Sequence, residues 1–196
     1  MQASGFVLAG GGSKRMGRNK ALLPFRGMTL VEHIAGMVRQ AAGSVTLIGD
    51  PAQLAHLGLP VVPDKLPASG PAGGIYTALT ITSSDWNLIA GCDMPAITSG
   101  ILLNLLRRAA VTSNPIDCLA AAGPDGEPEP LCAVYHRRCL PAVDRAIREN
   151  RLKMKDLLLE LGVEMLPVDP SALANVNTPA EWAEFEAKLP AGAKLP

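Results

Sequence analysis

Short apolar runs alternate with amphipathic segments over the first 109 residues of the chain, and this alternation constrains the fold more than any other feature. Four runs are typical of short buried strands, and three segments carry apolar residues at helical spacing. The runs are 5–10, 44–49, 59–63 and 86–95, and the helical segments are 29–42, 70–81 and 97–109. This order predicts an α/β fold with a doubly wound, mostly parallel, Rossmann-like sheet that helices cover on both faces.

Two of the predicted helices carry clear end signals. Thr29 suits the N-cap of the first helix, and Gly43 follows its last turn as a stop. A terminal helix over 178–189 has Thr178 at its N-cap and Glu181 three residues later, the pattern of a capping box. The sequence therefore fixes where these helices begin.

The second half of the chain alternates less regularly. Two strands are predicted on either side of a Pro/Gly-rich loop, and two helices and a strand follow before the terminal helix. In chain order these segments are 116–122, 123–130, 131–136, 139–150, 152–161 and 163–168. We find no repeat and no linker, so we expect a single domain over residues 1–196, with 190–196 as a loose tail.

Composition excludes several classes of protein. The 18 basic residues balance 18 acidic ones, which argues against a general nucleic-acid or anionic-membrane surface. No apolar run is long enough to span a membrane, and we see no signal-peptide pattern. The four cysteines lack metal-ligand spacing and are predicted to be reduced thiols. We expect a cytoplasmic protein that binds neither nucleic acid nor membranes.

The first predicted strand ends in a glycine triplet at 10–12, which is followed by four cations, Lys14, Arg15, Arg18 and Lys20. The dinucleotide fingerprint would need a glycine in place of Arg15, and a P-loop would need Lys-Ser or Lys-Thr after Gly17, so neither motif is present. The glycines expose backbone N–H groups, and cations follow them. This combination favours binding of an anion or of the edge of a base. A plain tight turn is the alternative, but it needs no cations.

Five segments, in order, resemble the motifs of the nucleotidyltransferases related to molybdenum cofactor guanylyltransferase. They are LAGGGSKRMGRNKALLPFRG, PDKLPASGPAGGIYTAL, AGCDMPAIT, DGEPEPLCAVYH and ANVNTPAEW. The resemblance covers about residues 5–189 and implies a nucleotide-binding half at 1–110 and an acceptor-binding half at 111–189. One departure is Ala72, where the family usually has leucine, followed by Gly73 and Gly74; we expect it to alter the base pocket.

The resemblance implies transfer of GMP from GTP to the terminal phosphate of molybdopterin, with release of pyrophosphate and with Mg²⁺ as the cofactor. A phosphate monoester is already largely ionised at neutral pH, so its attack requires no general base. The main barrier to this reaction is electrostatic repulsion between its two polyanionic substrates. The task left to the enzyme is positioning and charge stabilisation.

The resemblance also assigns residues to the donor side of this reaction. Arg15, Lys20 and Asp93 are the expected catalytic residues, with Asp93 as the metal ligand. The expected nucleotide-binding residues are Leu8, Ala9, Gly10, Gly11, Lys20, Asp64 and Gly70. Two alternatives stay open: Asp93 as the cap of the helix that follows it, and Asp64 as a turn aspartate.

On the acceptor side, the resemblance assigns Asn175 and Asn177, whose amides can donate and accept along a pterin edge. A turn-stabilising role is the alternative for Asn175. Three further cations, Arg151, Lys153 and Lys155, suit either the acceptor phosphate or a solvated helix face, and the second is favoured.

Three rival functions remain at this point. A sister enzyme that uses CTP often has alanine where this chain has Gly11, which favours guanine. A sugar-1-phosphate nucleotidyltransferase has a similar first motif but not the Asn-Val-Asn-Thr-Pro close. A non-catalytic nucleotide-binding relative would not need Arg15, Lys20 and Asp93. For the main function we expect GTP, molybdopterin and transient contact with other molybdenum cofactor biosynthesis proteins as partners.

Overall fold

The computed structural model describes residues 2–10, 19–112 and 115–188. Within these ranges one sheet has seven strands in the order β5-β4-β1-β6-β8-β7-β9. β8 is antiparallel to both of its neighbours, and every other pair in the sheet is parallel. The strands are β1 (Ala3–Leu8), β4 (Thr46–Ile48), β5 (Val61–Val62), β6 (Trp86–Gly91), β7 (Cys118–Ala122), β8 (Pro128–His136) and β9 (Val163–Pro167). The mostly parallel α/β sheet predicted from the sequence is confirmed.

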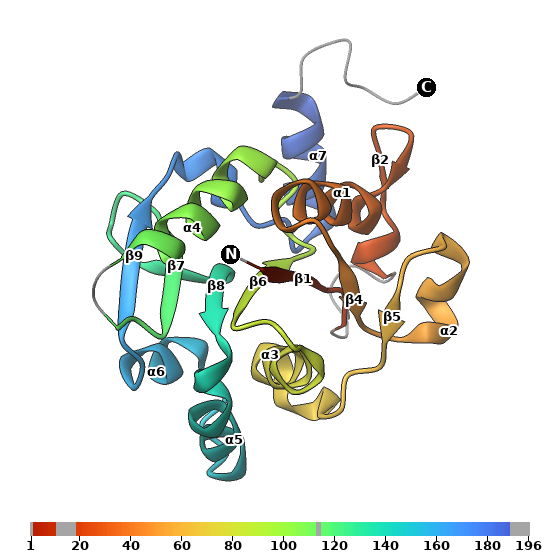
Figure 1. The fold of residues 1–196 in the computed structure, drawn as a ribbon. Coiled ribbons are helices and arrows are strands. Elements are labelled where there is room, and N and C mark those ends of the chain that lie inside the picture. The colour runs from red at the N-terminus through yellow and green to blue at the C-terminus, as the bar shows by residue number, and fades with distance from the viewer. Residues whose placement is uncertain (1, 11–18, 113–114, 189–196) are drawn as a thin grey trace.

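Helices cover both faces of this sheet (Figure 1). One face carries α1 (Leu30–Ala42), α4 (Ser99–Val111) and α7 (Pro179–Lys188), whose buried residues belong to one apolar cluster with the sheet. The other face carries α3 (Gly70–Ile81), α5 (Leu140–Arg148) and α6 (Met154–Leu159), which build a second cluster. Burial of a continuous apolar layer on each face holds the strands in place, as a doubly wound fold requires. The layers therefore follow the predicted pattern.

The helix-end signals act as predicted. Thr29 and Glu32 form a capping box at the start of α1, and Gly43 ends it in the left-handed conformation at φ 78°. At the start of α7, the Glu181 amide donates to the Thr178 hydroxyl while the Glu181 carboxylate accepts from the Thr178 amide. Both helices therefore begin where short-range chemistry dictates.

Smaller elements were not predicted. They include the hairpin of β2 (Pro24–Phe25) and β3 (Met28–Thr29), and the short helix α2 (Pro51–Leu54), which follows an Asp50 N-cap. There are also five 3-10 turns in the described residues, η1 (Lys20–Leu22), η2 (Ala55–Leu57), η3 (Pro67–Ser69), η4 (Arg137–Cys139) and η5 (Pro170–Leu173). These elements are too short to show a helical or strand periodicity in the sequence.

The chain changes direction across the sheet between β1 and β6. From β1 it proceeds to β4 and β5 on one side, and it then returns to place β6 on the other side of β1. In open α/β sheets the crevice at such a switch point, beyond the carboxyl ends of the strands, is where ligands bind. The carboxyl ends of β1 and β6 lie next to each other, since Leu8 pairs with Gly91.

β8 departs from regular pairing near the same edge. Ala120 of β7 pairs with Ala133, but the next residue, Ala121, pairs with Glu129, so three residues of β8 bulge out of register. The bulge is anchored from within, because the hydroxyl of the fully buried Tyr135 donates to the carbonyl oxygen of Pro130 at 3.0 Å. Bulges of this kind re-aim side chains next to functional sites.

Candidate active site

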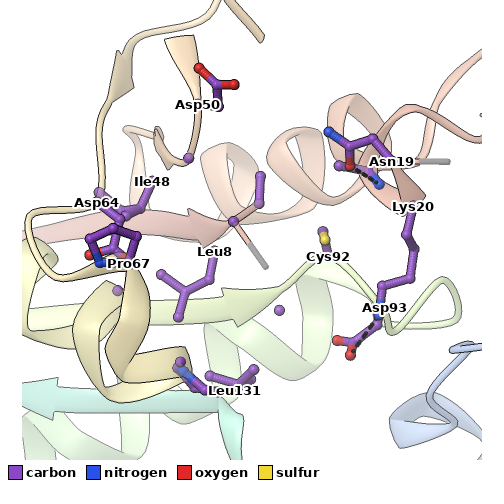
Figure 2. A pocket seen from close by; sticks show the side chains of 18 of the residues that line it. Leu8, Asn19, Lys20, Ile48, Asp50, Asp64, Pro67, Cys92, Asp93 and Leu131 are labelled. Carbon is purple, nitrogen blue, oxygen red and sulfur yellow. Dashed lines mark hydrogen bonds and ion pairs between the residues drawn. The ribbon is translucent and has the colours of Figure 1, made fainter. Parts of the chain in front are cut away.

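A cavity of about 720 Å³ opens at the carboxyl ends of β1 and β6 (Figure 2). Its walls come from the end of β1, from η1, from the end of β4, from the loop before α3 and from the segment after β6. The lining residues are Leu8, Ala9, Gly10, Asn19, Lys20, Ala21, Ile48, Gly49, Asp50, Pro51, Pro63, Asp64, Pro67, Gly70, Pro71, Gly74, Gly91, Cys92, Asp93, Leu131 and Asn177. Of the residues predicted to bind nucleotide or catalyse, all that the structure describes lie here.

The backbone at the end of β1 forms the floor of the cavity. The Ala9 amide donates to the Ile48 carbonyl, and the Leu8 carbonyl accepts from the Cys92 amide, so both residues are fixed to neighbouring segments. A Cβ on Gly10 would meet only ordinary contacts at 3.8 Å from Gly49 and Ile48. The packing of the described residues therefore does not require glycine here, and close approach of a ligand is a reason for it.

The start of α3 forms one wall of the cavity. A Cβ on Gly73 would lie 2.2 Å from the Leu66 carbonyl oxygen, and one on Gly74 would lie 2.9 Å from the Leu8 side chain. The two glycines therefore let the helix approach the loop before it and the end of β1. The departure noted at Ala72 leaves that residue buried, at 1% exposed. Gly70, in the left-handed region at φ 55°, turns the chain into the helix.

Asp64 lies in the same wall and makes structural contacts. Its Oδ1 accepts from the Leu66 amide at 2.9 Å and from the Thr77 hydroxyl at 3.0 Å, which joins the loop to α3. The turn role left open by the sequence is therefore present. Asp64 also lines the cavity, so it faces the space where a nucleoside would lie.

Lys20, Asp93 and Asn177 meet at the opposite end of the cavity. The Lys20 Nζ lies 3.2 Å from Asp93 Oδ2 and 2.9 Å from Asn177 Oδ1, so one ammonium contacts both oxygens. The two charged side chains are only 15% and 21% exposed. Figure 2 shows Lys20 extending from η1 toward Asp93 along the cavity wall. Partial burial of this pair weakens solvent screening and makes the interaction stronger than a surface salt bridge.

The surroundings of Asp93 indicate a ligand-facing carboxylate rather than a helix cap. The N-cap of α4 is Thr98, whose hydroxyl accepts from the Ile101 amide, so Asp93 does not fill that position. Space for its carboxylate comes from Gly91, where a Cβ would lie 2.6 Å from Asp93 Oδ1. A carboxylate that lines a cavity beside an amide oxygen is a donor set that suits Mg²⁺, which takes one or two carboxylates together with substrate phosphates and waters.

The two asparagines assigned to the acceptor have different surroundings. Between them, the amide of Val176 donates to the Asp93 carbonyl oxygen at 2.8 Å, which fixes the segment against the end of β6. Asn177 lines the cavity and holds Lys20, which places it on the nucleotide side. Asn175 is exposed and does not line the cavity among the described residues.

Glu129 was not predicted as a site residue. Burial raises the pKa of its carboxyl, the hydrogen bond from the Leu131 amide partly offsets this, and the charge of Asp93 raises the pKa further. The influence of Asp93 shows that the two carboxylates lie near each other. The sequence offered one weak signal, the glutamate in the Pro-Glu-Pro at the start of β8.

Other predicted residues fall outside this constellation. Gly11 and Arg15 lie outside the described residues. On the acceptor side, Arg151 pairs with Glu149 and Glu160, and Lys155 pairs with Glu127. These two cations therefore take part in surface ion pairs, which agrees with the favoured interpretation of a solvated face.

The thiols offer no nucleophile at the site. All four cysteines are free and buried, and burial, with the charge of Asp93 second, raises the pKa of Cys92 to about 12. Among the described residues there is no group of three His, Cys, Asp or Glu side chains that could hold a metal without a substrate. No helix in the described part of the chain is long and apolar enough to cross a membrane.

Known proteins of similar sequence match most of the chain. Residues 5–164 match the model of the MobA-like NTP transferase domain. A probable molybdenum cofactor guanylyltransferase of Carboxydothermus hydrogenoformans is 34% identical, over 91% of this chain and 92% of that one. A protein with the same description from Flavobacterium johnsoniae is 30% identical, over 94% and 96% of the two chains.

Two solved structures share the fold. One is the molybdopterin-guanine dinucleotide biosynthesis protein A of Archaeoglobus fulgidus, with a TM-score of 0.78 and 24% identity over 95% of this chain and 100% of that one. The other is a CMP:2-keto-3-deoxy-manno-octonic acid synthetase in complex with CTP, with a TM-score of 0.76 and 15% identity over 95% and 98% of the two chains. At these identities they establish the architecture alone.

Proposed function

This chain belongs to the MobA-like NTP transferase domain family, and from that premise we propose that it transfers GMP from GTP to the terminal phosphate of molybdopterin. Membership makes it a nucleotidyltransferase. The observation that carries the proposal is the placement of Lys20 between Asp93 and Asn177, at the end of a cavity at the switch point of the sheet. Guanine as the base and molybdopterin as the acceptor are supported by the names of the relatives.

The proposed reaction forms a bond between an acceptor phosphate oxygen and the α-phosphorus of GTP. The bond from the α-phosphorus to the bridging oxygen breaks, and pyrophosphate leaves with the electron pair. The nucleophile is already an anion, so the site needs no general base. This agrees with a cavity whose lining, in the described residues, has no histidine and whose one cysteine is held neutral by its high pKa.

Different described residues would contact different parts of the donor nucleotide. Leu8, Ala9, Gly10 and Gly70 present backbone to the base and sugar, and the carboxylate of Asp64 faces the same space. Lys20 holds the triphosphate and stabilises the charge that grows on pyrophosphate. From the motif, we assign backbone contact with the base and sugar to Gly11. We assign contact with the triphosphate and the leaving pyrophosphate to Arg15.

Asp93 is the residue that would hold Mg²⁺. The bound cation would neutralise part of the charge on the phosphates, which reduces the repulsion between two polyanionic substrates. For the chain itself, the consequence is that Asp93 must be presented in a fixed orientation. Its neighbours provide this orientation, through the Val176 amide on its carbonyl and the space beside Gly91.

The acceptor would approach from the side of Asn175 and the β8 bulge. This side is built from residues after 111, while the nucleotide wall is built mostly from residues before that point. We expect the enzyme to act in the cytoplasm, where GTP is available, and to exchange molybdopterin in transient contact with other proteins of molybdenum cofactor biosynthesis.

The direct test is turnover of the purified protein with Mg²⁺, molybdopterin and either GTP or CTP, with product identified by mass spectrometry and pyrophosphate measured in parallel. We expect a guanine dinucleotide of molybdopterin and an equal amount of pyrophosphate with GTP. Preferential turnover of CTP would overturn the base assignment. Release of pyrophosphate with glucose 1-phosphate, but not with molybdopterin, would overturn the acceptor. Protection against thermal unfolding by GTP, with no turnover on any acceptor, would indicate a binding protein instead.

A further inference from the structure

One face of α3 lies against the loop that carries Asp64. Gly73 and Thr77 are four residues apart in this helix, so they share that face. A Cβ on Gly73 would lie 2.2 Å from the Leu66 carbonyl oxygen and 3.3 Å from Asp64 Oδ1. The helix therefore comes near enough for a short side chain on the same face to bond directly with the loop.

Thr77 is that side chain, and its hydroxyl both donates to the loop and accepts from it. It donates to Asp64 Oδ1 at 3.0 Å and accepts from the Lys65 amide at 3.0 Å, and the residue is fully buried. A threonine inside a helix can instead donate to the carbonyl one turn earlier. Thr80 of the same helix does so, at 2.7 Å from the Tyr76 carbonyl oxygen. The hydroxyl of Thr77 thus joins the helix to the loop.

These contacts leave the two oxygens of the Asp64 carboxylate with different roles. Oδ1 accepts from the Thr77 hydroxyl at 3.0 Å and from the Leu66 amide at 2.9 Å. Both hydrogen bonds that described residues make to this carboxylate fall on Oδ1, while Asp64 lines the cavity. Figure 2 shows Asp64 on one side of the cavity, with Lys20 and Asp93 on the other. Oδ2 is therefore the oxygen left for a ligand, on the side away from Lys20.

We propose that Thr77 is a positioning residue for nucleotide binding: its hydroxyl fixes Oδ1 of Asp64, so that Oδ2 is presented to a hydrogen-bond donor of the nucleoside. A carboxylate oxygen only accepts hydrogen bonds, and its charge repels phosphate, so Asp64 suits the hydroxyl or N–H groups of a nucleoside. The inference rests on the proposed function in placing the nucleoside beside Asp64. Orientation of a group before the ligand arrives lowers the cost of binding, so Thr77 can affect affinity without touching the ligand.

The test compares two substitutions of Thr77 with one matched control. Thr77→Val has nearly the shape of threonine but lacks the hydroxyl, so it leaves Asp64 Oδ1 and the Lys65 amide each without this partner. Thr77→Ser keeps the hydroxyl and loses only a methyl group. The control is Thr80→Val, three residues later in α3, where the threonine is exposed and its hydroxyl donates within its own helix. Melting temperature is measured for each variant, so that loss of fold is separated from loss of position.

Two probes separate the two ends of the cavity. Binding of GTP and of inorganic tripolyphosphate is measured by isothermal titration calorimetry, without acceptor. We expect Thr77→Val to raise the Kd for GTP about 5- to 30-fold, the size of weakening one hydrogen bond to a charged group, while the Kd for tripolyphosphate stays near that of the wild type. Thr77→Ser and Thr80→Val should resemble the wild type with both probes. In turnover, the loss should appear in the KM for GTP and not in kcat, because a nucleoside contact made equally in the ground and transition states affects binding alone.

A further variant, Asp64→Ala, links the effect to the carboxylate. It should raise the Kd for GTP at least as much as Thr77→Val does, and the double variant should bind no more weakly than Asp64→Ala, because both residues act through one carboxylate. Additive losses in the double variant would contradict this link.

Three other results would overturn the proposal. Equal weakening of both probes in Thr77→Val would show a general loss of structure. An unchanged Kd for GTP in that variant would show that the hydroxyl is not needed, and an equal loss in Thr77→Ser would show that the methyl group is the required part. If the wild type prefers CTP, or transfers GMP to no acceptor, the proposed function fails, while the same comparison with the preferred nucleotide still tests Thr77.

Discussion

Replacing Lys20 with methionine should change metal binding and turnover in opposite directions. The Lys20 ammonium lies 3.2 Å from Asp93 Oδ2, so it contacts the carboxylate that we assign to Mg²⁺. A divalent cation that binds without nucleotide must displace it. When nucleotide is bound, the triphosphate offers Lys20 a stronger partner. Lys20→Met removes the competitor in the first state and a catalytic cation in the second.

The structure sets the size of the first effect. Coulomb's law with an effective dielectric constant of about 20 gives roughly 5 kcal/mol for two unit charges at this separation. The cost of removing both groups from water offsets much of this, and hydrogen bonds to charged groups contribute a net of about 1.5 to 3 kcal/mol. Since about 1.4 kcal/mol corresponds to a factor of ten, the affinity for metal without nucleotide should rise about 10- to 100-fold.

The second effect has the size of losing one preorganised charge donor, about 100- to 1,000-fold in kcat. The assay for the first is a Mn²⁺ titration followed by electron paramagnetic resonance in the absence of nucleotide. The assay for the second is pyrophosphate release at saturating GTP and acceptor. Lys155→Met, which breaks a surface ion pair with Glu127, is the control and should change neither quantity.

Two outcomes would refute this reasoning. Weaker or unchanged Mn²⁺ binding in Lys20→Met would show that the ammonium does not compete for Asp93. Equal losses in GTP affinity and in kcat/KM, with kcat at saturation intact, would show that Lys20 only anchors the ground state. Arg15 would then be the first residue to test for the transition-state role.

Three further predictions follow from single features of the structure. Asp93→Asn should abolish turnover while the melting temperature stays near that of the wild type, because an amide cannot replace the carboxylate at the metal; near wild-type turnover at saturating Mg²⁺ would exclude the metal role. Gly73→Ala should destabilise the fold by about 1 to 3 kcal/mol, since the new Cβ would lie 2.2 Å from a backbone carbonyl oxygen, and should lower the melting temperature by several degrees. Gly36→Ala, in the middle of α1 with nothing within 4 Å of its Cβ, is the matched control and should be neutral or slightly stabilising. The hydrogen bond from the Thr29 side chain is the main cause that lowers the pKa of Glu32 below 4.5, so this carboxylate stabilises the fold at neutral pH and that contribution is lost as the pH falls through its folded pKa. Glu32→Ala should therefore cost about 1 kcal/mol at pH 7 and progressively less as the pH falls below 4.5, measured by urea unfolding, and a cost that does not fall with pH would contradict the capping role.

The elements that the sequence predicted are those whose causes lie within a few residues. The capping box of α1 joins positions three apart, and its end at Gly43 depends on one residue that adopts φ 78° without strain. The runs at β1 and β6 are mostly apolar because both faces of a parallel sheet are covered. Strand order, the reversed direction of β8 and its bulge depend on pairings between distant segments, which leave no local pattern.

The site was predicted residue by residue but not as a set of contacts. The motif indicated Lys20, Asp93 and Asn177 separately, and it assigned the asparagine to the acceptor. The hydrogen bonds that join them span 73 and 157 positions of sequence, so no spacing could reveal that one ammonium contacts both oxygens. Glu129 was missed because it lies beside the β8 bulge, which depends on pairing between distant segments.

These contacts join the two halves of the chain at the proposed reaction centre. Asp93 follows β6 of the first half, and five residue pairs join that strand to β8 of the second half. The carbonyl of Asp93 is then fixed by Val176, and its carboxylate partner Lys20 is fixed by Asn177. A nucleotide bound by the first half would therefore meet a catalytic pair whose orientation depends on the second. On the proposed function, the acceptor side would influence chemistry at the α-phosphorus without contact with the nucleotide, because Val176 and Asn177 of that side contact Asp93 and Lys20.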